Sequence, residues 1–126
     1  MAAIASTAFV LFISPHSSSA TPRHALGGHF AALIVVNVLS VAVGSEIGER
    51  LIGDTPVLFA FYAALGVGIT MLAMAITDTE HPPASGTALG VVAHGFDWGL
   101  VFFVATVVVM LVAVHRVFRS HMTDLS

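Results

Sequence analysis

The sequence predicts an all-α integral membrane protein with about four transmembrane segments in two hairpin-like halves. Of its 126 residues, 57% are hydrophobic and only 9% are charged, whereas a soluble domain usually carries about a quarter charged residues. Several long runs have no charge at all, and polar stretches rich in proline and histidine separate them. In water such a chain would expose aliphatic surface, so the lipid bilayer is its expected surrounding.

The first apolar segment, Ala2–Ile13, is short for a membrane crossing. The small residues of 17–20 resemble a signal-peptide cleavage site, but no Lys or Arg precedes the apolar run as such a signal requires. We therefore expect a membrane segment, either a half-helix or a helix shortened by the choice of start site.

Three later runs are long enough to cross a bilayer core, which needs about 20 apolar residues of helix. They are Ala25–Val43, Val57–Ile76 and Trp98–Val114, the last extendable to Phe118. The polar segment 44–56 is expected to be a solvated turn between the first two.

The arginines predict the orientation of these segments. Counting hairpins places Arg23 on one side of the membrane and the other three arginines on the opposite side. The positive-inside rule then predicts a multi-pass protein of the cell membrane, with its C-terminus in the cytoplasm and both Pro/His stretches outside. His115, in the polar C-terminal part, is expected to be solvated.

Both Pro/His stretches predict helix starts. In "SATPRHALGG", Thr21 is the expected N-cap and Pro22 the first helical residue. In "TEHPPASGTALG", the residue before each proline is driven toward extended backbone, so Pro83 is the expected first residue of the next helix. Pro82 and Pro83 thus stop one helix and aim the next, or simply form a tight turn between two helices.

Such helix starts are candidate anion sites. A helix N-terminus carries partial positive charge and offers free N–H groups. Arg23 lies in the first turn, where a cation is unfavourable without a negative partner. Asp78, Glu80 and a bound anion are the alternatives for that partner.

The segment after Pro83 is too short to span before "AHGFDWG" interrupts it. This predicts a re-entrant or interfacial half-helix, followed by a last span with Asp97 as N-cap and Trp98 at the membrane interface. Irregular backbone at membrane depth requires protein or water to satisfy it. A re-entrant half-helix therefore implies a polar cavity.

The chain is expected to form a single transmembrane domain, 1–126, with an internal repeat of roughly 1–55 and 56–126. "HALGGHFAAL" aligns with "TALGVVAHGF", and each half has an incoming apolar segment, a Pro/His stretch and an outgoing helix. Parallel repeats of this kind occur in transporters. The alternative is coincidence in a sequence rich in Ala, Gly and Leu.

"SPHSSSATPRHALGGH" and "TDTEHPPASGTALG" resemble the two signatures of the HPP family of integral membrane proteins, named for the tripeptide His81–Pro83. The resemblance covers Ala5–Arg116. Family members have four transmembrane segments, and plant members are implicated in nitrite transport across the chloroplast envelope. This chain has Ser85-Gly86 where the family pattern has Gly-Ala, and its first segment is shorter. The resemblance implies a transporter or channel for a small anion, with nitrite or a similar oxyanion as the expected substrate.

The helix starts and the resemblance together define a candidate substrate site. In it the arginine supplies fixed positive charge, and the hydroxyl groups donate hydrogen bonds. The histidine of the tripeptide donates as a neutral ring or, when protonated, couples anion and proton movement. We expect the following side chains to bind the anion: Arg23, His81, Ser85 and Thr87, with His16 and His29 behind them.

Two other kinds of function remain open. His16, His24, His81 and Glu80 could meet outside the membrane as a metal site, although their spacing matches no standard ligand pattern. The chain could instead be a membrane scaffold or sensor subunit that transports nothing.

Composition and motifs argue against the remaining classes. With no cysteine and no basic patch, neither a thiolate metal site nor nucleic-acid binding is expected. No catalytic constellation points to an enzyme or to a cofactor. Because four short segments can hardly enclose a pathway, we expect a homo-oligomer, with Ala60, Ala64 and Gly68 as a small-residue stripe for helix packing.

Overall fold

The computed structural model describes residues 2–44, 50, 53–95 and 97–125. These residues are helical or irregular, and no strand occurs in the described ranges. The elements are α1 (Ala2–Ile13), η1 (Ser18–Ala20), α2 (Pro22–Val43), α4 (Pro56–Thr77), α5 (Pro82–His94), α6 (Trp98–Phe118) and η2 (Arg119–His121).

Three of these helices are long and apolar enough to cross a membrane: α2, α4, and α6 with its continuation to His121. The apolar runs of the sequence predicted their positions to within a few residues, and α1 has the predicted bounds Ala2–Ile13. Because α1 and α5 are shorter, the fourth span and the re-entrant half-helix stay predictions.

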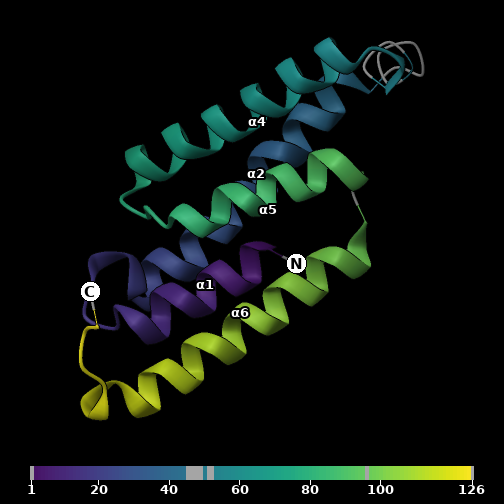
Figure 1. The fold of residues 1–126 in the computed structure, drawn as a ribbon. Helices are drawn as coiled ribbons and strands as arrows, with labels where there is room; N and C mark the ends of the chain where they lie inside the picture. The colour runs from purple at the N-terminus through teal and green to yellow at the C-terminus, as the bar shows by residue number, and fades with distance from the viewer. Residues whose placement is uncertain (1, 45–49, 51–52, 96, 126) are drawn as a thin grey trace.

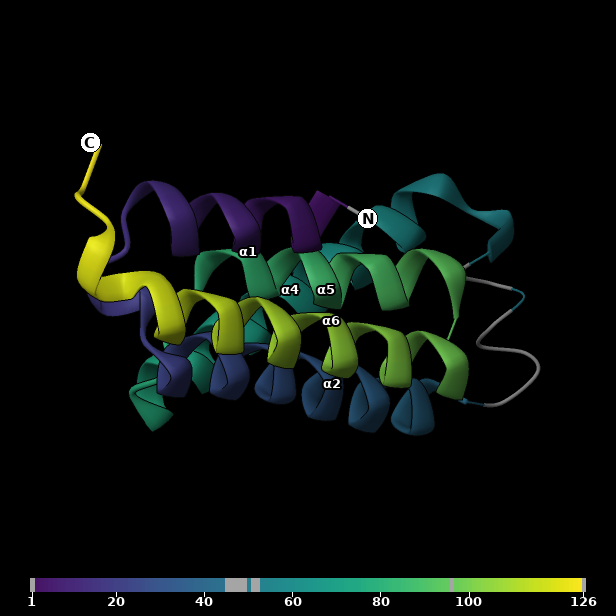
Figure 2. The ribbon, with the colours of Figure 1, turned by 90° about the horizontal axis from the view of Figure 1, so that it is seen from below.

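The helices lie side by side, and α5 is central (Figures 1 and 2). It packs against α1, α2 and α4. Its buried face carries mostly small residues, including Ala84 and Ala88, which allow the neighbouring helices to come close. Gly28 of α2 lies close to the start of α5, since an added Cβ there would lie 2.8 Å from the Cβ of His81.

Both Pro/His stretches lie at one end of the bundle, which we call the link end (Figure 1). The first link, 14–21, connects α1 to α2, and the second link, 78–81, connects α4 to α5. Thr21 is the N-cap of α2 and Pro22 its first residue, as predicted.

The start of α5 differs from the prediction by one residue. Its first helical residue is Pro82, and His81 is the N-cap. His81 is extended, with φ −132° and ψ 93°, as a residue before proline must be. The fixed φ of Pro82 suits the first helical position, so the helix begins at Pro82 rather than at Pro83.

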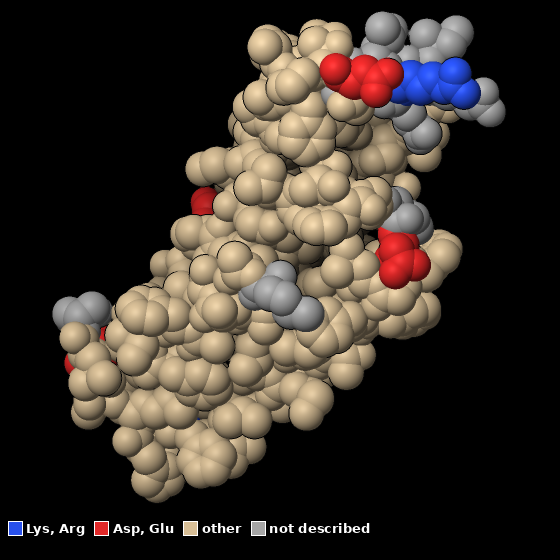
Figure 3. Space-filling view, turned by 45° about the vertical axis from the view of Figure 1, so that its right-hand side comes forward, with Lys and Arg blue, Asp and Glu red and all other residues tan. Residues whose placement is uncertain are grey.

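The outer surface of the bundle is apolar between its two ends. Figure 3 shows charged residues at the ends of the visible face and a broad uncharged surface between them. Large side chains such as Phe30, Phe61 and Phe102 are exposed there. This surface suits a lipid surrounding rather than water.

His115 was predicted to be solvated, and that prediction is wrong. Its side chain is buried, and its Nε2 donates to the carbonyl oxygen of Pro15 at 3.1 Å. Because α6 continues past Val112 and packs against Leu11 of α1, the last turn remains inside the bundle.

Candidate functional site

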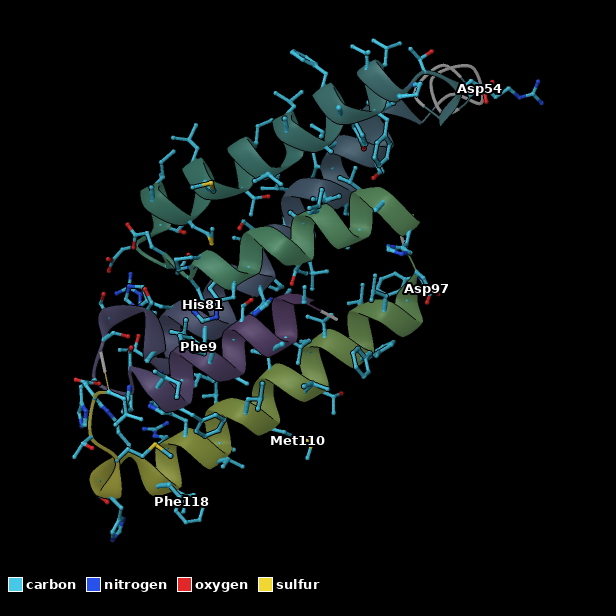
Figure 4. The ribbon with its side chains drawn as sticks, in the orientation of Figure 1. Phe9, Asp54, His81, Asp97, Met110 and Phe118 are labelled. Atoms are coloured by element: carbon cyan, nitrogen blue, oxygen red, sulfur yellow. The ribbon has the colours of Figure 1, made fainter. Side chains whose placement is uncertain are left out.

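A buried polar network lies between α1, α2 and α5. It consists of the Ser19 carbonyl group and the side chains of His81, Thr7, His29 and Thr87. The four side chains are at most 5% exposed. Figure 4 shows His81 inside the bundle, near the link end. Polar groups inside a membrane protein are costly and usually mark function.

The network is continuous in hydrogen-bond distance. The Nδ1 atom of His81 lies 2.8 Å from the Ser19 carbonyl oxygen, and its Nε2 lies 3.2 Å from Thr7 Oγ1. Thr7 Oγ1 is also 2.9 Å from Nε2 of His29. Nδ1 of His29 lies 2.8 Å from Thr87 Oγ1. The two imidazole rings lie with their centroids 5.4 Å apart.

The Ser19 carbonyl fixes the tautomers when both rings are neutral. A carbonyl oxygen only accepts, so Nδ1 of His81 carries the hydrogen and Nε2 accepts from the Thr7 hydroxyl. Thr7 Oγ1 then accepts from the Nε2–H of His29. Nδ1 of His29 in turn accepts from the Thr87 hydroxyl. Each polar atom has a partner.

Local sequence places each of these groups. His29 lies on the buried face of α2, one residue after Gly28 and a turn after Ala25, which is helical spacing for one face. The missing side chain at Gly28 leaves room for the Cβ of His81 and the carbonyl oxygen of Thr79 beside α2. Thr7 lies one turn before the buried Leu11 on the inner face of α1.

The surroundings of His81 favour its neutral form. Burial lowers the pKa of His81 from its ordinary value of 6.5. The hydrogen bond to Ser19 acts in the opposite direction and raises this pKa, whereas the nearby His24 lowers it further. The direction of the pKa shift agrees with the hydrogen-bond assignment.

Arg23 has a protein partner at the link end. Its guanidinium Nη1 lies 3.1 Å from Oδ2 of Asp78, and its Nη2 donates to the Thr77 carbonyl oxygen at 3.2 Å. Of the partners considered from the sequence, Asp78 is the one that the structure provides. Both side chains are well exposed, so the pair contributes little to stability.

The helix starts offer fewer free donors than predicted. Pro22, Pro82 and Pro83 have no N–H group. The backbone N–H of His24 donates to Thr21 Oγ1 at 3.4 Å, and that of Ala84 donates to the His81 carbonyl oxygen at 2.8 Å. The expectation of open N–H groups at both starts was therefore too simple, because proline removes the donors it places first.

The structure brings together three of the six predicted substrate-binding residues: His29, His81 and Thr87. Arg23 lies at the same end of the bundle but on its surface. The Ser85 hydroxyl donates to the carbonyl oxygen of Pro82 in its own helix, at 2.7 Å.

His16 lies apart from the network, in the first link. Its backbone N–H donates to Oδ1 of Asp124 at 3.0 Å. Its ring Nδ1 is 3.5 Å from the same oxygen. His16 therefore ties the first link to the C-terminal segment.

The four residues considered as a metal site do not share one cluster. His81 points into the buried network, and His16 contacts Asp124. His24 lies 3.7 Å from Glu80 and 3.9 Å from Asp78. Arg23 pairs with the Asp78 carboxylate, so His24, Asp78 and Glu80 form a polar cluster at the link end that already contains its own cation.

Sequence reasoning missed Thr7, which joins the two histidines. The sequence did offer one signal, because Thr7 is one of two hydroxyl residues in the otherwise apolar segment Ala2–Ile13. The other, Ser6, is exposed and donates to the Ala2 carbonyl oxygen of its own helix. Only the packing of α1 against α5 and α6, which places Thr7 inside the bundle, distinguishes the two.

A cavity of about 420 Å³ meets the network at Thr87. Its wall includes Gly90, His94 and Asp97, which lie toward the end of the bundle opposite the links. Figure 4 shows Asp97 at that end. The Asp97 side chain caps α6, as predicted, by accepting from the backbone N–H of Leu100 at 3.1 Å.

Comparisons with known proteins place this chain among membrane proteins. A family described as HPP, transmembrane region, matches residues 1–124. The chain is 33% identical over 85 residues to a curated transmembrane protein of Dictyostelium discoideum, a match that covers 68% of this chain and 27% of that protein. No solved structure matches.

Proposed function

This chain belongs to the HPP transmembrane family, and we propose that it carries a small anion, nitrite or a similar oxyanion, across the membrane. It is a membrane protein with three helices of spanning length. The proposal concerns what passes through it and where that solute binds.

The observation that carries the proposal is the buried polar network in an otherwise apolar bundle. A protein that only had to be stable in lipid could fill this space with apolar side chains, without the cost of burying two histidines and two threonines. The network reaches from the second link to a cavity near the middle of α5. The network would therefore supply polar groups along the inner part of the path that the anion takes.

The roles in this path follow from position. Arg23 lies at the mouth of the link end, where its charge would attract an anion. Small hydroxyl and imidazole donors, namely those of Thr87, His29 and His81, would then replace water around it. Like the network side chains, Ser85 and His16 would take part only after leaving their present partners.

The remaining topology belongs to the same proposal. We place α1 and α5 as half-helices that meet inside the membrane, with α5 re-entrant from the link end. The pairs α1–α2 and α4–α5 each enter and leave by a link, which supports the internal repeat. The backbone N–H of Leu125 donates to the Ile13 carbonyl oxygen at 3.0 Å, so the C-terminus and the links lie at the same end of the bundle, and the prediction that they lie on opposite sides of the membrane is wrong. Because Arg23, Arg116 and Arg119 are all at this end, we place the C-terminus and both links together in the cytoplasm, in a multi-pass protein of the cell membrane.

A homo-oligomer would complete the enclosure of the path. The stripe of Ala60, Ala64 and Gly68 lies on the exposed face of α4. A Cβ added at Gly68 would meet no atom within 4 Å in the described residues. This open, flat face allows close helix packing between copies.

The test is anion uptake into proteoliposomes, comparing nitrite, nitrate, formate and chloride. Empty liposomes are essential controls, because nitrous and formic acids cross lipid unaided. We expect uptake of at least one oxyanion above that control, and reduced uptake with Arg23→Gln and His81→Ala. Equal fluxes with and without protein, or fluxes unchanged by both substitutions, would refute the proposed site.

A further inference from the structure

The buried polar network has a second hydrogen-bond arrangement that needs no movement of heavy atoms. The Thr7 hydroxyl lies 2.9 Å from the Ala3 carbonyl oxygen of its own helix and 3.2 Å from Nε2 of His81. Its single hydrogen can point to only one of them at a time. When the hydrogen points to His81, Nε2 of that ring must accept it. When the hydrogen points to Ala3, Nε2 of His81 can carry a hydrogen and donate to Thr7.

We propose that this network is a proton-binding site, in which the Thr7 hydroxyl switches direction when a proton is taken up. The proposal rests on the transport function above, because it makes the proton a co-substrate of the anion. The ligand is the proton, and the groups that hold it are the His81 ring, the Thr7 hydroxyl and the Ser19 carbonyl.

When one proton is bound, every polar group of the network still has a hydrogen-bond partner. The proton forms a bond to Nε2 of His81, and no covalent bond breaks. The Thr7 O–H turns to the Ala3 carbonyl, and Thr7 Oγ1 then accepts from the N–H groups of both histidines. His81 still donates from Nδ1 to Ser19. The imidazolium therefore has an acceptor on each nitrogen, although the two rings lie close together.

The charged and titratable groups around the pair favour reversible binding. From α2, His24 faces His81 and itself contacts Glu80 and Asp78 of the second link. Thr7 and Thr87 contribute only hydroxyl groups, and the neighbouring α6 residues beside His29 are valines and Ala105, which do not titrate. Since no carboxylate contacts either ring in the described residues, nothing holds the bound proton permanently.

The cavity at Thr87 supplies a route for the proton. Thr87 closes the network at one side and lines the cavity of about 420 Å³ with His94 and Asp97. From Thr87 to His94, α5 rises by about 10 Å. A proton passed by water in this cavity reaches His29 through the Thr87 hydroxyl, which accepts one proton and gives up its own. His29 then gives its Nε2 proton to Thr7, and Thr7 gives its own proton to Nε2 of His81. This leaves the hydrogen of His29 on Nδ1, and the bound arrangement above is reached once His29 exchanges that hydrogen for one on Nε2.

The matched substitutions are Thr7→Val, Thr7→Ser and Thr70→Val. Valine keeps the shape of threonine and removes the hydroxyl, whereas serine keeps the hydroxyl. Thr70 is an equally buried threonine whose hydroxyl donates to the Gly66 carbonyl oxygen within α4, away from the network. It therefore controls for the loss of a buried hydroxyl as such.

The first measurement is NMR of the intact chain with ¹⁵N-labelled histidine in lipid, titrated from pH 8 to pH 4, with His81→Gln identifying the signal. We expect His81 to gain one proton while its Nδ1 stays protonated. Thr7→Val should move the midpoint down by about one pH unit or more, because the imidazolium loses an acceptor. Thr7→Ser and Thr70→Val should titrate as the unaltered chain does. An unchanged midpoint in folded Thr7→Val would overturn the proposal.

The second measurement is nitrate uptake into proteoliposomes with and without an acidic exterior. We expect acid to accelerate uptake, and Thr7→Val to lose that acceleration by about tenfold or more. Nitrate uptake that ignores both pH and Thr7 would overturn the proton proposal and leave anion transport standing. A Thr7-dependent titration in a chain that transports no anion would instead refute the transport function and confirm the proton site.

Discussion

The hydroxyl oxygen of Thr7 lies 2.9 Å from Nε2 of His29, joining α1 to α2 inside the bundle. The same oxygen is within 3.2 Å of His81, at the start of α5. One small side chain thus holds together three elements that are far apart in sequence. The stability and the chemistry of the network both depend on it.

Thr7→Val is expected to lower the free energy of unfolding by about 1–3 kcal/mol, because it leaves the buried N–H of His29 without an acceptor. The measurement is thermal unfolding in mild detergent. Thr70→Val is the control and should cost less, since its hydroxyl bonds only within α4. Equal losses for the two variants would show that the network adds no stability.

Gly28→Ala is expected to destabilise the bundle by about 1–3 kcal/mol through overpacking. Its Cβ would lie 2.8 Å from the Cβ of His81 and 3.1 Å from the Thr79 carbonyl oxygen, neither of which can move freely. Gly90→Ala is the matched control within α5, because its Cβ would meet nothing within 4 Å. That control should be neutral or stabilising by about 0.5–1 kcal/mol. A harmless Gly28→Ala would mean that α2 and the second link are not in close contact.

Stability is expected to fall in acid partly because of His81. Its pKa is lowered in the folded chain, so the unfolded chain takes up this proton first as the pH decreases. The contribution is complete above the ordinary pKa of 6.5 and is lost as the pH falls below it. Between pH 8 and pH 5, the melting temperature of His81→Gln should therefore drop less than that of the unaltered chain. His121→Gln, at an exposed position, should follow the unaltered chain, and identical slopes in all three would contradict the account.

Arg23→Gln is expected to change the free energy of unfolding by less than about 1 kcal/mol, because its pair with Asp78 is exposed. Its effect on anion uptake should be larger and should shrink at high ionic strength, where charge attraction is screened. Asp78→Asn offers the opposite change of charge and should raise uptake at low salt. Matching losses in both variants would indicate that the pair serves structure alone.

Much of the fold could be predicted from the sequence, because it depends on local patterns. Long apolar runs determined α2, α4 and α6, and the capping residues Thr21 and Asp97 marked two helix starts. These features involve neighbours in sequence. The helix boundaries therefore agree to within a few residues.

The candidate site was only partly predictable, because its contacts cross between helices. Polar residues within apolar segments pointed to His29, and the Pro/His motif pointed to His81. Thr7 and the buried His115 looked ordinary, since only the packing of α1 shows what they contact. For Arg23, the charge was visible in the sequence, but the choice of Asp78 required the structure.

The two prolines that open α5 also decide what amide exchange can report there. Neither Pro82 nor Pro83 has a hydrogen to exchange, and the first amide after them, that of Ala84, is bonded to His81. In deuterium-labelling mass spectrometry, a peptide covering this turn would therefore report its opening through few amides, that of Ala84 among them. Motion at the second link is better followed by a spectroscopic label on Thr79, which lies against Gly27.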